Sequence, residues 1–261
     1  MEKSISNAFT YMFKDSDWKY KLFVMLMFMS PPYILQGILP QLSTMIKTPA
    51  NSSIGFIIAL TVVLIVVTII FSLILSGYSI KCANNIIYSN EDSSYDSLLP
   101  KWEDDFGQFL KLGFKFVIAT SLFGISIAGI SSVFVLTAGI FKVVPLLIIL
   151  GGITALIAIL IYAYFFTALT SIFYSSYDIT SFLKFKEARK LVSYDTQKYL
   201  QILGIMFLVS LVFSIVPSLV SKSFLILLIA APIMQVYMML VSIYLIAMLF
   251  PAEPEVFFAT D

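Results

Sequence analysis

Three consecutive acidic residues carry the strongest chemical signal in this sequence. Glu103, Asp104 and Asp105 follow Trp102 in the segment LPKWEDDFG, which lies between long apolar runs. Carboxylates are the preferred ligands of hard cations, and a carboxylate pair with separated pKa values can transfer protons. Successive residues of a helix point about 100° apart, so these three carboxylates do not converge unless other segments supply partners.

An interfacial anchor explains the same segment without a catalytic or metal site. Pro100 suits a first helical turn, Asp104 or Asp105 can cap the next helix, and Trp102 can place its ring among lipid headgroups. A similar group of residues precedes the first apolar run. The residues expected to anchor the chain at the interface or to contact a partner are Asp17, Trp18, Lys19, Pro100, Trp102, Glu103, Asp104 and Asp105.

The composition excludes several classes of function. The chain has no histidine, so His-ligated zinc, His-ligated haem and Ser-His-Asp catalysis are absent, and its single cysteine cannot form an internal disulfide. A net charge of +1 gives no bulk attraction for nucleic acid. We therefore expect no cofactor, no metal, no nucleic-acid partner and no enzymatic activity.

The elements that must position these residues are membrane helices. The chain is 60% hydrophobic and only 12% charged, too apolar for a soluble domain of 261 residues. A helix needs roughly 20 apolar residues to cross about 30 Å of hydrocarbon. The sequence predicts an all-α polytopic membrane protein with six transmembrane helices, near Leu22–Leu42, Ile54–Tyr78, Phe116–Ile140, Val143–Phe166, Leu200–Leu219 and Phe224–Phe250.

The distribution of charge predicts the orientation. Of the 16 Lys and Arg residues, 13 fall before the first span or in alternate gaps between spans, and all 15 acidic residues fall on that same side. Positive charge stays in the cytoplasm, so we expect a cytoplasmic membrane protein with both termini inside the cell. The prolines at 31, 32 and 232 should kink their spans and not end them.

A weak threefold repeat suggests how the spans are grouped. The segments DWKYKLFVML, DFGQFLKLGF and DTQKYLQILG begin at Asp17, Asp105 and Asp195, each at a predicted helix start. We expect one integral domain over residues 1–261, made of three helical hairpins with pseudo-repeats near 17–104, 105–194 and 195–261. Chance resemblance of three short segments remains the alternative.

Cytoplasmic amphipathic helices are predicted between the hairpins. In ITSFLKFKEARKLVSY, apolar residues recur every three or four positions from Ile179 to Val192, as in a helix lying on the inner leaflet. The bilayer is thus one expected partner. The side chains expected to contact anionic lipid are Lys184, Lys186, Arg189 and Lys190.

Small residues at four-residue spacing occur within three of the spans. Such stripes allow close helix contact, and this is the favoured interpretation. A polar path for a solute along the serines is the alternative. The residues concerned are Gly124, Ala128 and Ser132, then Gly151 and Ala155, and finally Ser210, Ser214 and Ser218.

Short motifs along the chain resemble a known family. They are Asp15-x-Asp17-Trp18-Lys19 before the first span, Gly77-Tyr78 at the end of the second, the Leu99-Pro100-x-Trp102-acidic segment, and Tyr199-Leu200. Together they are similar to bacterial and archaeal membrane proteins catalogued as domain of unknown function 4013. The resemblance implies a multi-pass topology and no particular activity.

Three classes of function follow. The first is a non-enzymatic module that organises the membrane or binds another membrane or cytoplasmic protein. The second is a channel or permease for a small neutral or hydrophobic solute. The third is a lipid-modifying enzyme, which would require Asp178 and Asp195 to join the acidic trio and is disfavoured by the absence of histidine.

Overall fold

A computed structural model gives the arrangement of the helices. It describes residues 4–47, 54–89, 94–103, 106–140, 164–220 and 224–251, together with the single positions 153, 160 and 161. All regular structure in these ranges is helical, and no strand occurs in them. The all-α prediction is therefore confirmed for the described part of the chain.

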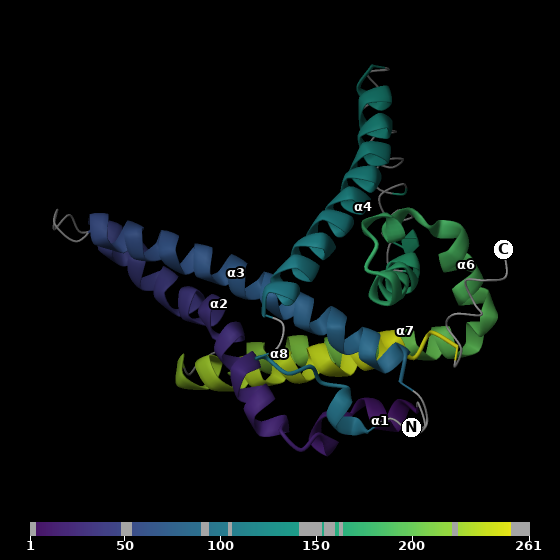
Figure 1. Cartoon of the computed structure of the whole chain (residues 1–261). Coiled ribbons are helices and arrows are strands. Elements are labelled where there is room, and N and C mark those ends of the chain that lie inside the picture. Colours follow the sequence, from purple (N-terminus) through teal and green to yellow (C-terminus); the bar gives the residue numbers. More distant parts are fainter. Residues whose placement is uncertain are drawn as a thin grey trace.

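Helices α2 (Trp18–Lys47) and α3 (Ile54–Ile87) lie side by side and form a long arm of the molecule (Figure 1). Pro31 and Pro32 lie within α2, and Pro232 lies within α8 (Phe224–Ala247), so the prediction that prolines would not end these helices is confirmed. Helices begin at Trp18, Phe106 and Thr196, one residue after each predicted start signal.

Helix α4 (Phe106–Ile140) crosses α3 and then rises away from it (Figure 1). Two glycines permit the crossing. A Cβ at Gly77 would lie 1.7 Å from the carbonyl oxygen of Phe109, and a Cβ at Gly113 would lie 1.8 Å from that of Leu73. Each helix thus places a glycine against the backbone of the other. Residue 77 lies next to 109 and residue 113 lies next to 73, so the two helices run antiparallel where they cross. Only glycine permits so close an approach.

Helix α8 passes beneath α2 and α3 and also contacts α7 (Thr196–Val220). The N-terminal segment, with α1 (Ile5–Ala8) and the 3-10 helix η1 (Tyr11–Lys14), packs on the C-terminal half of α8. The Tyr11 hydroxyl donates to the Leu240 carbonyl at 3.1 Å, and the Tyr237 hydroxyl donates to the Phe9 carbonyl at 3.2 Å. Chain segments from opposite ends of the sequence are therefore joined directly.

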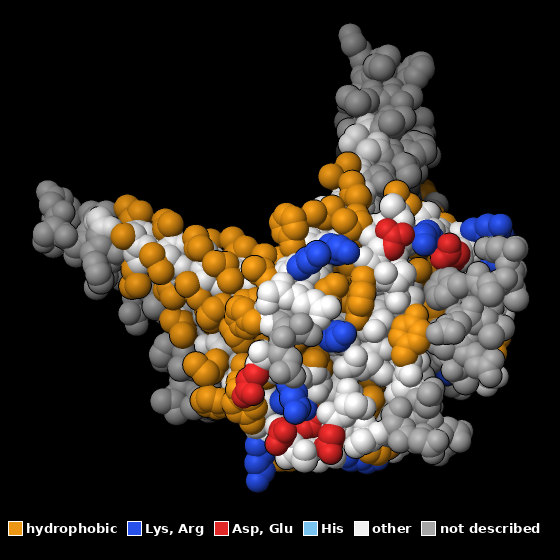
Figure 2. Space-filling model, in the orientation of Figure 1, with side chains coloured by type: hydrophobic (Ala, Val, Ile, Leu, Met, Phe, Trp, Pro, Cys, Tyr) orange, Lys and Arg blue, Asp and Glu red, His pale blue; other side chains and the backbone are white. Residues whose placement is uncertain are grey.

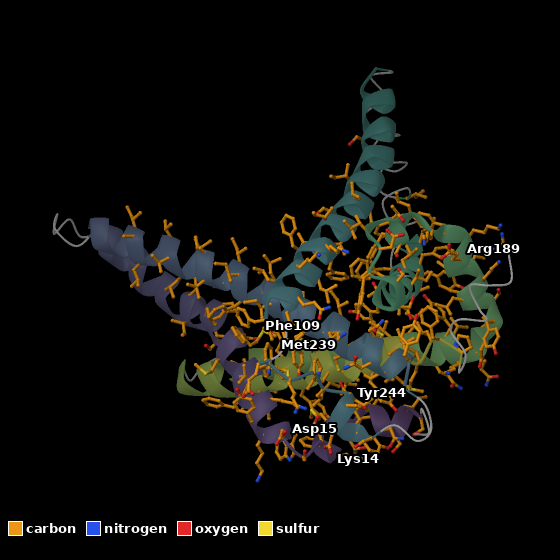
Figure 3. All side chains as sticks on the ribbon, in the orientation of Figure 1. Lys14, Asp15, Phe109, Arg189, Met239 and Tyr244 are labelled. Atoms are coloured by element: carbon orange, nitrogen blue, oxygen red, sulfur yellow. The ribbon has the colours of Figure 1, made fainter. Side chains whose placement is uncertain are left out.

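The buried side chains gather where α3, α4 and α8 meet and continue to the start of α2 and to residues 94–103, and we call this region the base. Phe109 and Met239 lie near its centre, whereas Arg189 lies at its edge (Figure 3). Charged side chains also gather over the base, while the α2–α3 arm presents an almost continuous apolar surface (Figure 2). In the most apolar 18-residue stretch of α3, only 11% of the residues are buried. An apolar surface of this extent requires lipid or another helix to cover it.

Three helical segments of the described residues are long and apolar enough to cross a membrane, compared with the six spans predicted from the sequence. They are Ile58–Ile87, Phe106–Ile125 and Ala230–Ala247. Thr196–Val212 is apolar but shorter. Most of the predicted span Val143–Phe166 lies outside the described residues.

Candidate functional site

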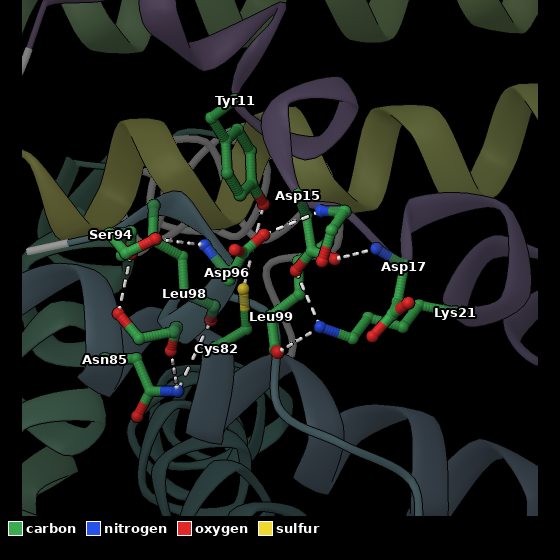
Figure 4. Close-up of polar contacts among 12 residues, drawn as sticks. Tyr11, Asp15, Asp17, Lys21, Cys82, Asn85, Ser94, Asp96, Leu98 and Leu99 are labelled. Atoms are coloured by element: carbon green, nitrogen blue, oxygen red, sulfur yellow. Dashed lines mark hydrogen bonds and ion pairs between the residues drawn. The ribbon is translucent and has the colours of Figure 1, made fainter.

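The base contains a buried ion pair at the start of α2. Lys21 Nζ lies 2.6 Å from Asp15 Oδ2, and the two side chains are only 3% and 1% exposed. Lys21 also donates to the Leu99 carbonyl at 2.8 Å, while Asp15 Oδ1 accepts from the Asp17 N–H at 2.8 Å (Figure 4). Burial of two charges is tolerated because each also has a further hydrogen bond. The pair ties the entry of α2 to the segment that precedes α4.

That segment also holds the N-terminal residues through polar contacts. Asp96 Oδ1 accepts from the Ser16 N–H at 2.7 Å, and Lys14 donates to the Tyr95 hydroxyl at 3.1 Å. The backbone hydrogen bond from Ser16 is the main reason that the pKa of Asp96 lies below its usual range. Asn85, near the end of α3, donates to the carbonyls of residues 97 and 98 (Figure 4).

Trp102 lies in a buried aromatic cluster that the sequence did not predict. Its ring stacks on Tyr78 with centroids 4.2 Å apart and planes at 10°, and Phe28 and Phe109 pack around it. The side chain is only 5% exposed, so the ring packs inside the protein, and its depth relative to the lipid headgroups stays a prediction. The motif could not reveal this, because the partner Tyr78 belongs to α3.

The other predicted anchor residues that the structure describes lie at or near the surface. Asp17, Lys19 and Glu103 are exposed, whereas Trp18 and Pro100 are partly buried. Trp18 packs edge-on against Phe13 and has Lys19 Nζ 5.8 Å from its ring centroid. Asp104 and Asp105 lie outside the described residues. The described residues contain no group of three or more His, Cys, Asp or Glu side chains able to hold a metal ion.

The predicted amphipathic helix is divided into two elements. A 3-10 helix, η3 (Ile179–Leu183), is followed by α6 (Phe185–Tyr194), with Lys184 between them. Lys184 pairs with Asp178 at 3.5 Å and with Glu187 at 3.9 Å. The pKa of Asp178 lies below its usual range, mainly because the Thr180 hydroxyl donates to it.

The basic residues of α6 lie on its outer side. Lys186 and Arg189 are exposed, and Lys190 is partly buried. The opposite side is buried through Ala188, Leu191 and Val192. This division agrees with the amphipathic pattern of the sequence, and contact with anionic lipid stays a prediction.

The predicted small-residue stripes fall mostly where side chains are not described. Ala128, Ser214 and Ser218 lie in described helices without described side chains, and Gly151 and Ala155 lie outside the described residues. Ser132 and Ser210 are exposed. Outside the adjoining backbone of its own helix, no described atom lies within 4 Å of a Cβ placed at Gly124. The close helix contact that the structure does contain uses Gly77 and Gly113.

A cavity of about 340 Å³ lies between α3 and α8, next to the base. Sequence analysis missed it, although Ser72, Ser76 and Ser79 recur on α3 at the spacing of one helix face. Gln235 on α8 was a further signal, because an amide within an apolar span is costly unless it has a role. The polar lining residues are Ser72, Ser76, Ser79, Tyr174, Gln235 and Ser242.

The cavity has a mouth and a floor. Ser72 and Gln235 are exposed at one end, whereas Ser79 and Tyr174 are 6% and 7% exposed at the other. The Tyr33 hydroxyl donates to Gln235 Oε1 and so orients the amide. The lining on α3 runs from Ser72 to Ile80, about 12 Å along the helix, which is less than half of the hydrocarbon thickness. A cavity of this depth is a pocket and not a continuous path for a solute across the membrane.

Comparison with known proteins supports the resemblance noted in the sequence. A family model described as "Protein of unknown function (DUF4013)" matches residues 60–222, more than half of the chain. No curated protein and no solved structure matches. The matched range contains the Gly77-Tyr78 and Leu99-Pro100-x-Trp102 motifs but not the Asp15–Lys19 motif. The chain belongs to the DUF4013 family of proteins of unknown function.

Proposed function

We propose that this chain is a six-span protein of the cytoplasmic membrane, with both termini in the cytoplasm, that acts as a non-enzymatic partner-binding or membrane-organising module. The observation that carries this proposal is the base itself. The Asp15–Lys21 pair and the Leu99 carbonyl join separate polar segments into one buried unit. Such a unit can present surface side chains in a fixed arrangement, as a binding surface requires.

The exposed side chains next to this unit form the proposed contact surface. They are Asp17, Lys19, Lys101 and Glu103, which carry both signs of charge. Complementary charge on a partner would orient its approach and select against other partners. The basic outer side of α6 supports a second contact, with anionic lipid, at about 1 kcal/mol for each Lys or Arg near the surface.

Photocrosslinking in native membranes tests the partner-binding proposal. A photoreactive residue at Lys101 should capture one reproducible protein, and one at Lys186 should capture lipid. A third, at Ile65 on the exposed apolar face of α3, gives the background of lipid contact. The charge reversals Lys19→Glu and Glu103→Lys should reduce capture at position 101. Capture of nothing but lipid and the protein itself at that position would contradict the proposal.

The cavity supports a second candidate, a permease for a small neutral solute. Its serines and glutamine could replace part of the hydration of an uncharged polar molecule. Flux of neutral solutes into proteoliposomes should then fall when Ser76→Leu fills the cavity, but not with Ser210→Leu on α7. The short lining on α3 argues against this candidate, and the absence of flux for every solute would exclude it.

A further inference from the structure

We propose that the cavity between α3 and α8 binds the head of a neutral acylglycerol, with its acyl chain leaving through the mouth into the bilayer. This inference goes beyond the partner-binding proposal and concerns a ligand taken from the membrane. It rests on the charge, the hydrogen-bonding groups and the shape of the cavity.

The lining disfavours a charged ligand. None of the described residues that line the cavity carries a charge. A phosphate or carboxylate in this apolar surrounding would be left without a counter-ion, at a cost of several kcal/mol. The lining therefore favours an uncharged ligand.

The polar groups that remain available define the head of the ligand. Ser76 and Ser79 donate to carbonyls of their own helix, at 2.8 Å each, so their oxygens are left as acceptors. Gln235 Oε1 is occupied by Tyr33, which leaves the amide N–H groups as donors. A molecule with hydroxyl donors and a carbonyl acceptor satisfies both, and the head of a monoacylglycerol carries two hydroxyls and one ester carbonyl.

The hydroxyls with no partner strengthen this assignment. Tyr174 lines the floor and is 7% exposed, yet within the described residues its hydroxyl makes no hydrogen bond, and neither do those of Ser72 and Ser242. Buried polar groups in native proteins are normally paired. Ser72 is exposed at the mouth and Ser242 is partly buried, so the buried Tyr174 is the side chain that indicates a ligand with a hydrogen-bonding group at the floor.

The size and direction of the cavity fit a lipid head and not a whole lipid. A volume of about 340 Å³ is at the lower end of the range for ligand sites. The floor lies toward the charged base, and the mouth lies toward the apolar arm. Met29, Met239 and Ile243 supply apolar lining for the first carbons of a chain. A lipid of the inner leaflet would enter with this orientation.

A photoaffinity experiment tests the proposal. The full chain is reconstituted in phosphatidylcholine nanodiscs with a trace of a diazirine-bearing, clickable monoacylglycerol, and the labelled peptides are identified by mass spectrometry. We expect labelling around residues 72–80 and 235–246, with competition by unlabelled monoacylglycerol. The pair Ser76→Ala and Ser242→Ala should reduce labelling about 25-fold, since each lost hydrogen bond weakens binding about fivefold.

Matched variants separate loss of the ligand from loss of the fold. Ser76→Thr keeps the hydroxyl and should keep the labelling, and Ser210→Ala removes an exposed serine outside the cavity and should change nothing. Shielding of the buried Cys82 from thiol reagents confirms that each variant is folded. Equal labelling by a fatty-acid probe of the same length would overturn the neutral-head assignment. Labelling of the cavity no stronger than that of the exposed α3 face, or unchanged in the double variant, would overturn the site.

Discussion

The α3–α4 crossing gives the sharpest test of the fold, through the substitution Gly77→Ala. A Cβ at this position would lie 1.7 Å from the Phe109 carbonyl oxygen, whereas Cβ atoms essentially never come closer than 3.0 Å to such an atom. The backbones would have to move apart by more than 1 Å. No rotamer change can relieve the clash, because the obstacle is the backbone of α4.

The expected cost follows from this geometry. Overpacking of a well-packed site costs about 1–3 kcal/mol, and we expect the upper value because no flexible side chain can yield. The crossing also positions Phe109 against the stacked pair of Tyr78 and Trp102. A loss of about 3 kcal/mol lowers the Tm of a chain of this size by about 6–12 °C. Gly113→Ala should have a similar effect, since its Cβ would lie 1.8 Å from the Leu73 carbonyl oxygen.

The assay can use the only cysteine of the chain. Cys82 is fully buried in α3, so its reaction with a thiol-reactive fluorophore during heating reports unfolding in mild detergent. Gly124→Ala and Gly204→Ala are the matched controls, because outside the adjoining backbone of its own helix no described atom lies within 4 Å of either Cβ. These two should leave the Tm unchanged or raise it slightly, as alanine is the better helix former. A Tm for Gly77→Ala within 1 °C of the wild-type value would refute the glycine-mediated crossing.

Three further predictions concern the base. Asp15→Asn leaves the charge of Lys21 buried and unpaired, so we expect the free energy of unfolding to fall by about 3–5 kcal/mol. The same thermal assay would show this as a lower Tm, and an unchanged Tm would contradict the buried pair. The Tyr78 hydroxyl is buried with no partner among the described residues, so Tyr78→Phe should be neutral or stabilise the protein by about 1 kcal/mol. A clear loss of stability would show that the hydroxyl does have a hydrogen-bond partner. The pKa of Asp96 is lower in the folded chain than the ordinary Asp pKa of about 3.9. The contact with Ser16 therefore stabilises the fold fully at pH values above about 3.9. This stabilisation is lost as the pH falls through the lower pKa of the folded state. Hydrogen exchange at the Ser16 amide should show protection at pH 5 that disappears in strong acid. Equal protection in Asp96→Ala, which removes the acceptor, would rule out this role.

The sequence by itself determined the class of the protein and much of its local structure. Apolar runs predict helices because a chain in lipid must satisfy its own backbone hydrogen bonds. Helices do begin at Trp18, Phe106 and Thr196, and the family assignment is confirmed over residues 60–222. These features depend on neighbours along the chain, so a pattern of residues can reveal them.

Only the tertiary structure decided what each of these residues contacts. Trp102 had the sequence context of an interfacial anchor, yet it is buried because Tyr78, on a different helix, provides a face for stacking. The close glycine contact lies at Gly77 and Gly113, since a crossing point depends on two helices at once. The cavity, likewise, exists only where α3 and α8 come together, with Ser76 and Ser242 both in its lining. Contacts between distant segments depend on the packing of whole helices, which no single stretch of sequence encodes.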